Sequence, residues 1–306
     1  MTETSDKIEI WKDDWKEFEL LDSGNYRRLE RYGDLIMVRS EPRAWWQPDL
    51  PETEWKKAQA VFEKKSDGRD GDEPGEWQFT GKIPQDLVLE FEGVKARLKM
   101  TKMSKHVGVF PEQSPQWRWI TEKVKNAAKT THVGKPIRIL NMFAYTGMST
   151  LVAAAAGASV THVDGSKVAL TWANENAVLS GLKDKPVRWL LEDALKFIKR
   201  EVRRGNKYDA IIMDPPAFGR GPKGEVWKVE DSINELFENC RVVLSPEALF
   251  MFVTMYSIEA SSLSLANLMK GTLKGLGGTI INGELILKPK QNGKPLPLSL
   301  FAAWEK

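Results

Sequence analysis

The sequence has few residues that bind metals or form disulfide bonds. Cys240 is the single cysteine among 306 residues, and there are three histidines. One thiol excludes a disulfide framework within the chain, and so few ligands argue against a zinc site, so we expect no metal. Residues 1–15 lack the basic and apolar segments of a signal peptide, and no apolar run approaches the ~18 residues of a membrane helix. We therefore expect a cytoplasmic protein with no membrane attachment.

A strong excess of one charge is also missing, since the formal net charge is +3. Such a balance permits nucleic acid as a partner but does not argue for it. The chain is 42% hydrophobic and 28% charged, which is ordinary for a protein long enough to bury a large core. Eight of the 12 tryptophans lie in the first 120 residues. We therefore expect two parts of different structure, with most tryptophans in the core.

The second part, residues 134–306, alternates short apolar runs with amphipathic stretches, which is typical of a parallel sheet covered by helices on both faces. Two late runs are joined by turn-forming residues with no room for a helix, and we expect them to pair antiparallel. The expected strands are Ile137–Phe143, Val160–Val163, Val187–Leu191, Tyr208–Met213, Ala248–Met255, Gly278–Leu287 and Leu296–Trp304. The pattern predicts a doubly wound α/β fold with a mostly parallel seven-stranded sheet and an antiparallel last strand.

The first part, residues 1–133, is expected to form a small α+β module. Apolar and polar residues alternate on both sides of the turn Glu92-Gly93, so Leu87–Phe91 would pair with Val94–Leu98 in a hairpin. The other expected elements are a short helix at Trp55–Lys65, a polar loop at Asp67–Gly75 and a linking helix near Pro115–Thr130.

A glycine and three carboxylates follow the first four apolar runs of the second part. Gly147 lies in the first strand-to-helix turn, where it lets a ligand approach the backbone at a helix N-terminus. Asp164, Asp193 and Asp214 end the next three runs, and the ends of parallel strands meet at one edge of a sheet. A carboxylate at Asp164 suits ribose hydroxyls, and one at Asp193 suits an adenine amino group. The three-glycine fingerprint of NAD and FAD sites is absent.

Helix capping is the alternative for each carboxylate. A lone aspartate after a strand is more often an N-cap or a turn residue than a ligand contact. Three of them at successive strand ends, after a loop that contains glycine, favour a nucleoside cofactor instead.

These motifs resemble those of the class I S-adenosylmethionine-dependent methyltransferases, in particular the group that makes 5-methylcytosine in 23S ribosomal RNA. The resemblance covers residues 20–306. It rests on Lys105–Gln113, Asn141–Gly147, Val163–Ser166, Trp172–Ala177, Glu192–Ala194 and Asp214–Phe218. It implies a Rossmann-like methyltransferase fold, S-adenosyl-L-methionine as the cofactor and RNA, most of all ribosomal RNA, as the partner.

The resemblance also implies a role for each matching residue. The backbone around Phe143–Gly147 would contact the methionine portion of the cofactor, Asp164 would contact the ribose, and Asp193 with Ala194 would hold the adenine. Ser166 would support its loop. The implied cofactor-binding residues are Gln113, Phe143, Tyr145, Thr146, Gly147, Asp164, Ser166, Asp193, Ala194 and Asp214.

One departure from that group bears on the reaction. Cytosine C5 becomes nucleophilic only after a thiolate has attacked C6, and the relatives carry that cysteine after the fifth strand. Here the position reads Thr254-Met-Tyr-Ser257, without cysteine, and Cys240 recurs with Leu236 and Val243 at the helical spacing of a core residue. We therefore expect transfer to a nitrogen or an oxygen, and favour nitrogen over cytosine C5.

Transfer to nitrogen requires the protein to align the acceptor and to remove a proton. Asp214 and the carbonyl groups of the Asp-Pro-Pro turn would accept hydrogen bonds from an exocyclic amine, Phe218 would stack on the base, and Tyr256 would add a polar group. The expected catalytic residues are Asp214, Pro215, Phe218 and Tyr256. The plainer alternative is that the prolines end the strand and Phe218 belongs to the core.

Two basic segments bear on the substrate. Residues 196–207 carry six lysines and arginines in a stripe that is usually a solvated helix face. The loop Arg220–Lys228 contains Trp227 among basic residues, so it suits an RNA clamp or a plain flexible lid. The leading hypothesis is methylation of RNA at a nitrogen. The alternatives are a methyltransferase for a small molecule or a protein, and a cofactor- and RNA-binding module without catalysis.

Overall fold

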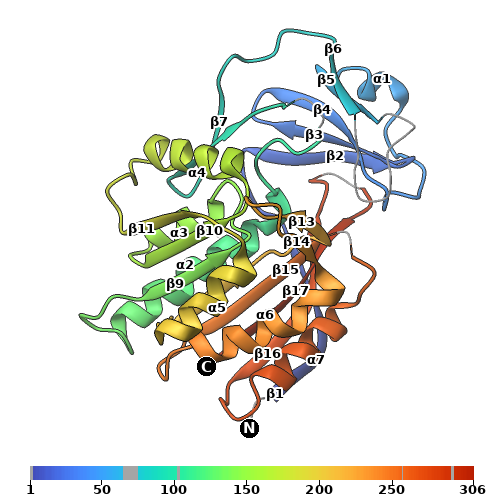
Figure 1. Cartoon of the computed structure of the whole chain (residues 1–306). Helices are drawn as coiled ribbons and strands as arrows, with labels where there is room; N and C mark the ends of the chain where they lie inside the picture. Colours follow the sequence, from blue (N-terminus) through green and yellow to red (C-terminus); the bar gives the residue numbers. More distant parts are fainter. Residues whose placement is uncertain (1–2, 65–74, 102–103, 257, 291–292) are drawn as a thin grey trace. The chain divides into compact units, whose positions relative to one another are not determined.

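The strands expected after residue 134 pair into one sheet, and an eighth strand from the N-terminal residues joins them (Figure 1). The computed structural model describes residues 3–64, 75–101, 104–256, 258–290 and 293–306. The order in the sheet is β1 (Glu3–Lys12), β16 (Thr279–Leu287), β17 (Leu296–Glu305), β15 (Phe250–Tyr256), β12 (Ala210–Met213), β9 (Arg138–Met142), β10 (Ser159–Asp164) and β11 (Val187–Leu191).

The pairing directions confirm a mostly parallel sheet. Strands β9, β10, β11, β12 and β15 form only parallel pairs with one another, whereas β17 runs antiparallel to β15. The expected number of seven strands is corrected to eight, because β1 pairs with β16. Gly283 of β16 permits this approach, since a Cβ at that position would overlap the carbonyl oxygen of Glu9.

The chain divides into two compact units. The larger one contains Met1–Trp11, Pro115–Leu285 and Ser299–Lys306, and the smaller one contains Lys12–Ser114 and Ile286–Leu298. These bounds differ from the expected division at residues 133 and 134. Strand β1 belongs to the large sheet, and the expected linking helix near Pro115–Thr130 lies in the larger unit as well.

Helices cover both faces of the large sheet. They are α2 (Ser114–Lys129), α3 (Met148–Ala155), α4 (Lys167–Leu179), α5 (Ala194–Arg204), α6 (Val229–Val243) and α7 (Ser262–Thr272), and a small hairpin of β13 (Phe218–Arg220) and β14 (Val226–Lys228) precedes α6. Buried residues of α5, α6 and α7 pack in one cluster with Leu140 and Met251 of the sheet. On the opposite face, Trp119 of α2 packs against Phe250, with ring centroids 5.0 Å apart. The doubly wound arrangement is therefore confirmed.

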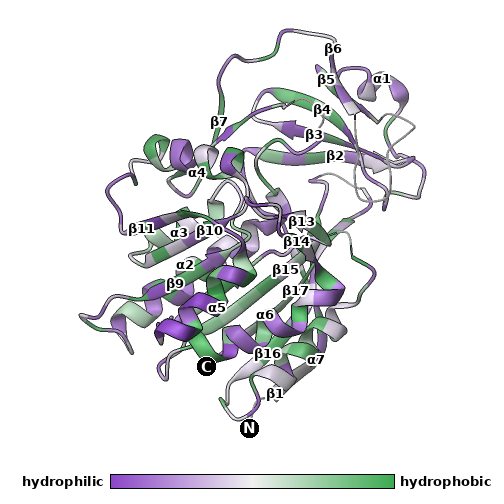
Figure 2. Cartoon of the chain, in the orientation of Figure 1, coloured by the Kyte–Doolittle hydropathy of each residue, from purple (hydrophilic) through white to green (hydrophobic). Residues whose placement is uncertain are grey.

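The hydropathy of the strands follows from this double coverage. In Figure 2 the strands β9 and β15 are mostly hydrophobic, whereas α5 and α6 alternate between hydrophilic and hydrophobic residues. A strand that is buried on both faces needs apolar side chains on both, but a surface helix needs them on one face only. Among the described residues no helix has the length and the apolar character to cross a bilayer.

The smaller unit contains two sheets. Strands β2 (Phe18–Gly24), β3 (Arg27–Tyr32), β4 (Leu35–Ser40), β5 (Ala60–Lys64) and β6 (Gly75–Phe79) form the larger of them, and β7 (Leu87–Phe91) pairs with β8 (Val94–Leu98). Its helical segments are α1 (Glu52–Trp55) and the 3-10 turn η1 (Pro111–Gln113). The predicted hairpin is confirmed with its register, because Phe91 faces Val94 and Glu90 faces Lys95.

The helix expected at Trp55–Lys65 is wrong. The helix α1 ends at Trp55, and residues 60–64 form β5 instead. Ala60 and Phe62 are buried while Glu63 is exposed, so the segment follows the two-residue period of a strand. Residues 67–74 of the expected polar loop lie outside the described residues. Tryptophan is mostly internal, as expected, and Trp45 is the exception at 76% exposed.

A buried ion pair joins strands β3 and β4 of the smaller unit. Arg39 and Glu30 are almost fully buried, and Arg39 Nε lies 2.7 Å from Glu30 Oε2. Arg39 also donates to the Tyr32 hydroxyl at 2.6 Å and to the carbonyl of Lys105 at 3.1 Å. The other face of the same strands is apolar, with Leu29 against Trp55. A buried pair of this kind contributes little net stability but is costly to break on one side.

Glu112 of η1 makes the stability of the protein depend on pH. Its side chain is 1% exposed, and burial raises its pKa to about 7. A carboxyl group whose pKa is raised by folding stabilises the folded state at low pH, and this contribution is lost as pH rises through about 7. Glutamine does not titrate, so Glu112→Gln lacks this pH-dependent loss of stability. The free energy of unfolding of the variant minus that of wild type should therefore increase by ~3 kcal/mol between pH 4.5 and pH 8.

Urea unfolding of both proteins across this pH range measures the effect. The exposed Asp34→Asn variant controls for the loss of one negative charge. An unchanged difference between Glu112→Gln and wild type from pH 4.5 to pH 8 would contradict the buried acid as its cause.

Candidate functional site

Three strand ends lie at the same level of the large sheet. In β9, Met142 pairs with Val163 of β10 on one side and with Met213 of β12 on the other. The strand that follows β9 in the chain lies on one side of it, and β12 lies on the other side, so the strand order reverses here. Open α/β sheets bind ligands outside the carboxyl ends of such strands. The residues that follow the three level positions are Phe143, Asp164 and Asp214.

The loop after β9 has an unusual backbone. Phe143 and Tyr145 have φ angles of 53° and 49°, and Gly147 has a φ of 89°. For the two non-glycine residues this left-handed conformation costs ~1 kcal/mol each. The carbonyl of Thr146 accepts a hydrogen bond of 3.0 Å from the Asn176 side chain, which holds the loop in place. Backbone strain that the surroundings enforce occurs preferentially at ligand-binding sites.

Asp164 joins this loop to the one after β10. Its Oδ2 accepts a hydrogen bond of 2.7 Å from the backbone N–H of Tyr145, and its Oδ1 accepts one of 2.8 Å from the N–H of Ser166. Burial raises the pKa of this carboxyl group. A carboxylate oxygen accepts more than one hydrogen bond, so Asp164 retains the capacity to accept from the hydroxyl groups of a ribose.

Ser166 and Asp193 are helix caps. Ser166 Oγ accepts from the N–H of Ala169 at 3.2 Å at the start of α4, and Asp193 Oδ1 accepts from the N–H of Lys196 at 2.8 Å at the start of α5. Ala194, the first residue of α5, is buried in the core. Ser166 and Asp193 are therefore helix caps, as the alternative interpretation predicts. Each side chain oxygen can accept more than one hydrogen bond, so capping does not prevent a contact with a ligand.

The expected catalytic residues lie along the neighbouring strand ends. Asp214 is half-buried and Pro215 is buried directly after β12. Met213 pairs with Val253 of β15, so Tyr256, the half-buried last residue of β15, lies beyond the level of Asp214.

The segment after Asp214 forms a hairpin rather than a flexible loop, and its tip lies against the loops after β10 and β11. A Cβ at Gly165 would be 3.3 Å from the carbonyl oxygen of Arg220. A Cβ at Gly221 would be 3.1 Å from Cβ of Asp193. The sequence showed both glycines, but only their contacts reveal why side chains would be poorly tolerated there.

An ion pair ties this hairpin to α5. Lys196 Nζ lies 2.7 Å from Glu225 Oε1. The hydrogen bond from Lys196 lowers the pKa of Glu225 to about 2, so the pair stays ionised at neutral pH. The pairing joins residues that are 29 positions apart, and sequence reasoning missed it.

Two aromatic assignments change. Trp227 is 3% exposed, donates from Nε1 to the carbonyl of Pro216 at 2.7 Å and lies 4.8 Å from the Phe143 ring, so it cannot stack on RNA as the sequence suggested. Phe218 is 51% exposed, which rules out the alternative that it belongs to the core. The exposed ring next to the Asp-Pro-Pro turn is therefore Phe218.

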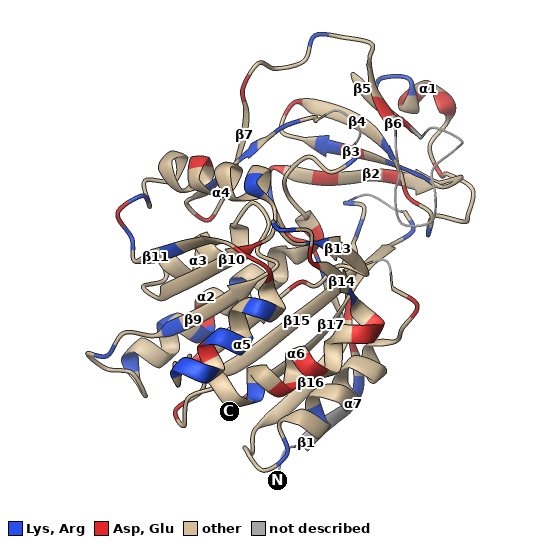
Figure 3. Ribbon diagram, viewed as in Figure 1, with Lys and Arg blue, Asp and Glu red and all other residues tan. Residues whose placement is uncertain are grey.

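The basic stripe is a solvated helix face, as expected. Figure 3 shows lysines and arginines along α5. Four of them form ion pairs with nearby carboxylates, namely Lys196–Glu225, Lys199–Glu235, Arg200–Glu192 and Arg204–Glu201. This face is largely neutralised within the protein itself.

Gln113 is buried at the end of η1 and belongs to the smaller unit, so its contact with a cofactor stays a prediction.

Within the described ranges, no three histidine, cysteine, aspartate or glutamate side chains are grouped closely enough to hold a metal ion.

A buried polar chain, which sequence reasoning missed, fixes α3 to the sheet. Asn141 Nδ2 donates to Thr150 Oγ1 at 2.9 Å, and that oxygen lies 2.9 Å from His162 Nδ1. Burial lowers the pKa of His162 to about 3, so the ring is neutral at physiological pH. Asn141 and His162 interrupt apolar strands, and this interruption is the signal that points to them. Together they join strands β9 and β10 to the first turn of α3, which follows the strained loop.

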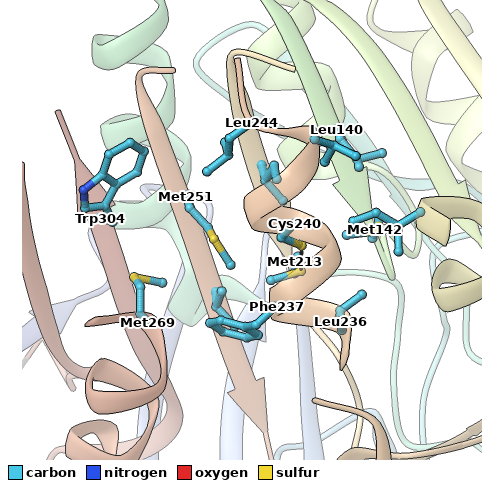
Figure 4. Close-up of a cluster of buried hydrophobic side chains, with 14 of the residues drawn as sticks. Leu140, Met142, Met213, Leu236, Phe237, Cys240, Leu244, Met251, Met269 and Trp304 are labelled. Atoms are coloured by element: carbon cyan, nitrogen blue, oxygen red, sulfur yellow. Dashed lines mark hydrogen bonds between the residues drawn. The ribbon is translucent and has the colours of Figure 1, made fainter. Parts of the chain in front are cut away.

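Cys240 is a core residue, as its helical spacing predicts. It is 0% exposed, its Sγ lies 3.6 Å from Sδ of Met213, and it is surrounded by apolar side chains such as Leu236 and Phe237 (Figure 4). Burial raises the pKa of the thiol, which keeps it protonated.

Comparison with known proteins gives consistent matches. The family model described as S-adenosylmethionine-dependent methyltransferase matches residues 56–238. A SAM-dependent methyltransferase from Agrobacterium tumefaciens, of known crystal structure, is 43% identical, with a TM-score of 0.90 and coverage of 99% of this chain and 95% of that one.

Curated relatives match over shorter regions. Ribosomal RNA large subunit methyltransferase K/L of Shewanella frigidimarina is 31% identical over 55% of this chain and 22% of that protein. Ribosomal RNA large subunit methyltransferase I of Shewanella denitrificans is 30% identical over 52% of this chain and 38% of that protein. The chain thus spans less than half the length of these two relatives.

Proposed function

Because the chain belongs to the S-adenosylmethionine-dependent methyltransferase family, we propose that it transfers a methyl group to a nitrogen atom of RNA, with ribosomal RNA as the substrate. The observation that carries this proposal is the common level of Phe143, Asp164 and Asp214 at one edge of the sheet. A ribosomal RNA substrate implies a cytoplasmic location. The names of the curated relatives support the choice of RNA over a small molecule.

The residues of the larger unit fit S-adenosylmethionine. The strained loop from Phe143 to Gly147 presents its backbone at the N-terminus of α3, which suits the methionine portion. Asp164 would accept hydrogen bonds from the ribose, and Asp193 with Ala194 would hold the adenine. Tyr145, Thr146 and Ser166 would keep the two loops in shape. When bound, the cofactor supplies a methyl carbon that is electrophilic because it is attached to a positively charged sulfur.

The acceptor would be positioned by the turn after β12. Asp214 and the carbonyl groups next to Pro215 would accept hydrogen bonds from an exocyclic amine, which directs the nitrogen lone pair toward the methyl carbon. Phe218 has an exposed ring for stacking on the base, and Tyr256 would add a polar contact. The proton that the amine loses would pass to Asp214 or to water.

The position of Cys240 supports nitrogen over cytosine C5. A C5 mechanism needs a thiolate that reaches the base, and the one thiol of the chain is fully buried and protonated. The position at the end of β15, where the 5-methylcytosine enzymes carry their catalytic cysteine, reads Thr254-Met-Tyr here and contains no cysteine.

Replacing Cys240 therefore tests the reaction class. Cys240→Ala should leave the rate of methyl transfer within twofold of wild type and should lower the free energy of unfolding by ~1 kcal/mol, because only a buried sulfur is removed. Initial rates with labelled cofactor and urea unfolding measure the two effects. A loss of transfer greater than a hundredfold in a folded variant would show that the thiol acts in the reaction.

The proposed activity is tested by incubating the protein with labelled S-adenosylmethionine and separate pools of ribosomal RNA, transfer RNA, protein and metabolites. Label in ribosomal RNA, found by nucleoside mass spectrometry on a base nitrogen, is the expected result. Label in the protein or metabolite pool favours a different acceptor. Binding of cofactor and RNA without transfer to any pool would replace catalysis by a binding function.

A further inference from the structure

The hairpin of β13 and β14 has two different faces. Phe218 pairs with Lys228 and Arg220 pairs with Val226, and all four side chains are exposed. Because side chains alternate along a strand, these four share one side, which we call the outer face. Trp227 points to the other side and is buried. The Arg220 guanidinium lies 5.8 Å from the centre of the Phe218 ring, so a cation and an aromatic ring adjoin each other on this surface.

The cations of the outer face differ from those of α5 in their partners. Arg220, Lys228 and Lys223 of the connecting turn form no ion pair with any residue that the structure describes. Glu225, the carboxylate of the same turn, is already paired with Lys196. The acidic residues that follow Lys228 lie in the first turn of α6, where they favour the helix N-terminus. Within the described part of the chain, three positive charges are therefore left for a ligand.

Folding alone does not explain the outer face. Phe218 is 51% exposed and Val226 is 55% exposed, so neither contributes fully to a core. The hairpin is held from its other side, where Trp227 donates to the carbonyl of Pro216 and packs against Phe143. Because Pro216 follows Asp214 by two residues, this anchoring fixes the outer face beside the proposed acceptor site.

We propose that the outer face is the docking surface for an unpaired stretch of the RNA substrate. Arg220, Lys223 and Lys228 contact phosphates that flank the methylated nucleotide, and Phe218 offers its face to a base. This chemistry fits single-stranded RNA because stacking requires a base that is free of its partner, while the cations follow the backbone without regard to sequence. The inference rests on the proposed function, since it assigns the RNA contacts of that same site.

The decisive experiment measures binding of a labelled, unpaired RNA of about 12 nucleotides by fluorescence anisotropy over a series of salt concentrations. In Arg220→Gln/Lys228→Gln the Kd should rise about tenfold, and the slope of log K against log salt should fall in magnitude by about 1.4, because each phosphate contact to a single strand contributes about 0.7. The matched control Lys199→Gln/Arg203→Gln removes two charges from α5 and should change neither value. A double-stranded RNA of the same sequence should bind wild type more weakly.

Kinetics separate this surface from the catalytic residues. The hairpin variant should raise KM for RNA about tenfold while kcat and the Kd for S-adenosylmethionine stay within threefold of wild type. Phe218→Leu keeps an apolar side chain but loses the ring, and should also weaken the binding of unpaired RNA about tenfold.

The outcomes distinguish the two proposals. If wild type methylates RNA and the hairpin variant shows the same Kd, salt slope and KM, the docking surface is wrong and the proposed function stands. If wild type neither binds nor methylates RNA, both fail. If the α5 control weakens binding as much as the hairpin variant, the attraction comes from net charge and the assignment to the outer face is wrong.

Discussion

Replacing Asp164 with alanine is expected to raise the Kd for S-adenosylmethionine at least a hundredfold. The carboxylate accepts hydrogen bonds from the backbone N–H groups of Tyr145 and Ser166, so its removal leaves both donors without a partner and separates the two loops. A hydrogen bond to a charged group contributes ~1.5–3 kcal/mol, so the loss of two such bonds to the ribose hydroxyls corresponds to ~100-fold or more in affinity. The loss of the two bonds within the protein adds to this effect, because the cofactor must then order the loops when it binds.

Isothermal titration calorimetry of the wild type, Asp164→Ala and Asp164→Asn measures the expected loss. The asparagine keeps the shape and one acceptor oxygen but turns an N–H group toward a backbone donor, so its Kd should lie between the other two. Asp184→Ala, in the exposed turn before β11, is the matched control and should bind the cofactor like wild type. A Kd within threefold of wild type in a folded Asp164→Ala protein would remove Asp164 from the site.

Asp214→Asn is expected to lower kcat for methyl transfer by about 10²–10³-fold. Asp214 follows the strand end that is level with the start of the loop from Phe143 to Gly147, and an amide in its place would present a donor where the proposed acceptor amine needs an oxygen. The side chains have nearly the same shape, so the fold and the Kd for S-adenosylmethionine should change little. The effect should therefore appear in the chemical step.

Single-turnover rates and calorimetry on the same preparation separate the two roles of Asp214. Asp231→Asn in the first turn of α6 is the control for the loss of a carboxylate, and its kcat should be unchanged. If the Kd for the cofactor rises in parallel with the fall of kcat, Asp214 holds the cofactor rather than the acceptor. An unchanged kcat would remove it from the catalytic residues altogether.

The larger unit was predictable because its signals are local. An apolar run, a glycine in a strand-to-helix turn and an aspartate at a strand end can each be recognised within a few consecutive residues, and the parallel pairing brings Asp164 and Asp214 to the same edge as expected. The eighth strand was not predictable in this way. Strand β1 is short of apolar residues because it lies at the border of the sheet, and its partner β16 is more than 260 residues away in the chain.

The burial of the ion pair in the smaller unit and the burial of Trp227 depend on contacts between segments that are distant in the sequence. Nothing in the local sequence marks the charged residues Glu30 and Arg39 as buried, whereas the structure buries them together. The assignment of Trp227 failed for the same reason: aromatic and basic residues in one short segment look equally exposed, and only the cross-strand register separates the outer face from the buried one. A local pattern shows which side chains share one face of a strand, but not which of the two faces is buried by the rest of the protein.

The place of β17 has a consequence for the order of folding. This strand is made after every other strand of the large sheet, yet it lies inside the sheet, between β15 and β16, and β1 pairs beyond it. The parallel half of the sheet can assemble as it is synthesised, but β1 and β16 have no route into the sheet until β17 has formed. Contacts of such large sequence separation close slowly, and unpaired strand edges are exposed to aggregation in the meantime. The protein is therefore expected to pass through a partly folded state during synthesis, in which β1 stays unpaired until β17 has been made.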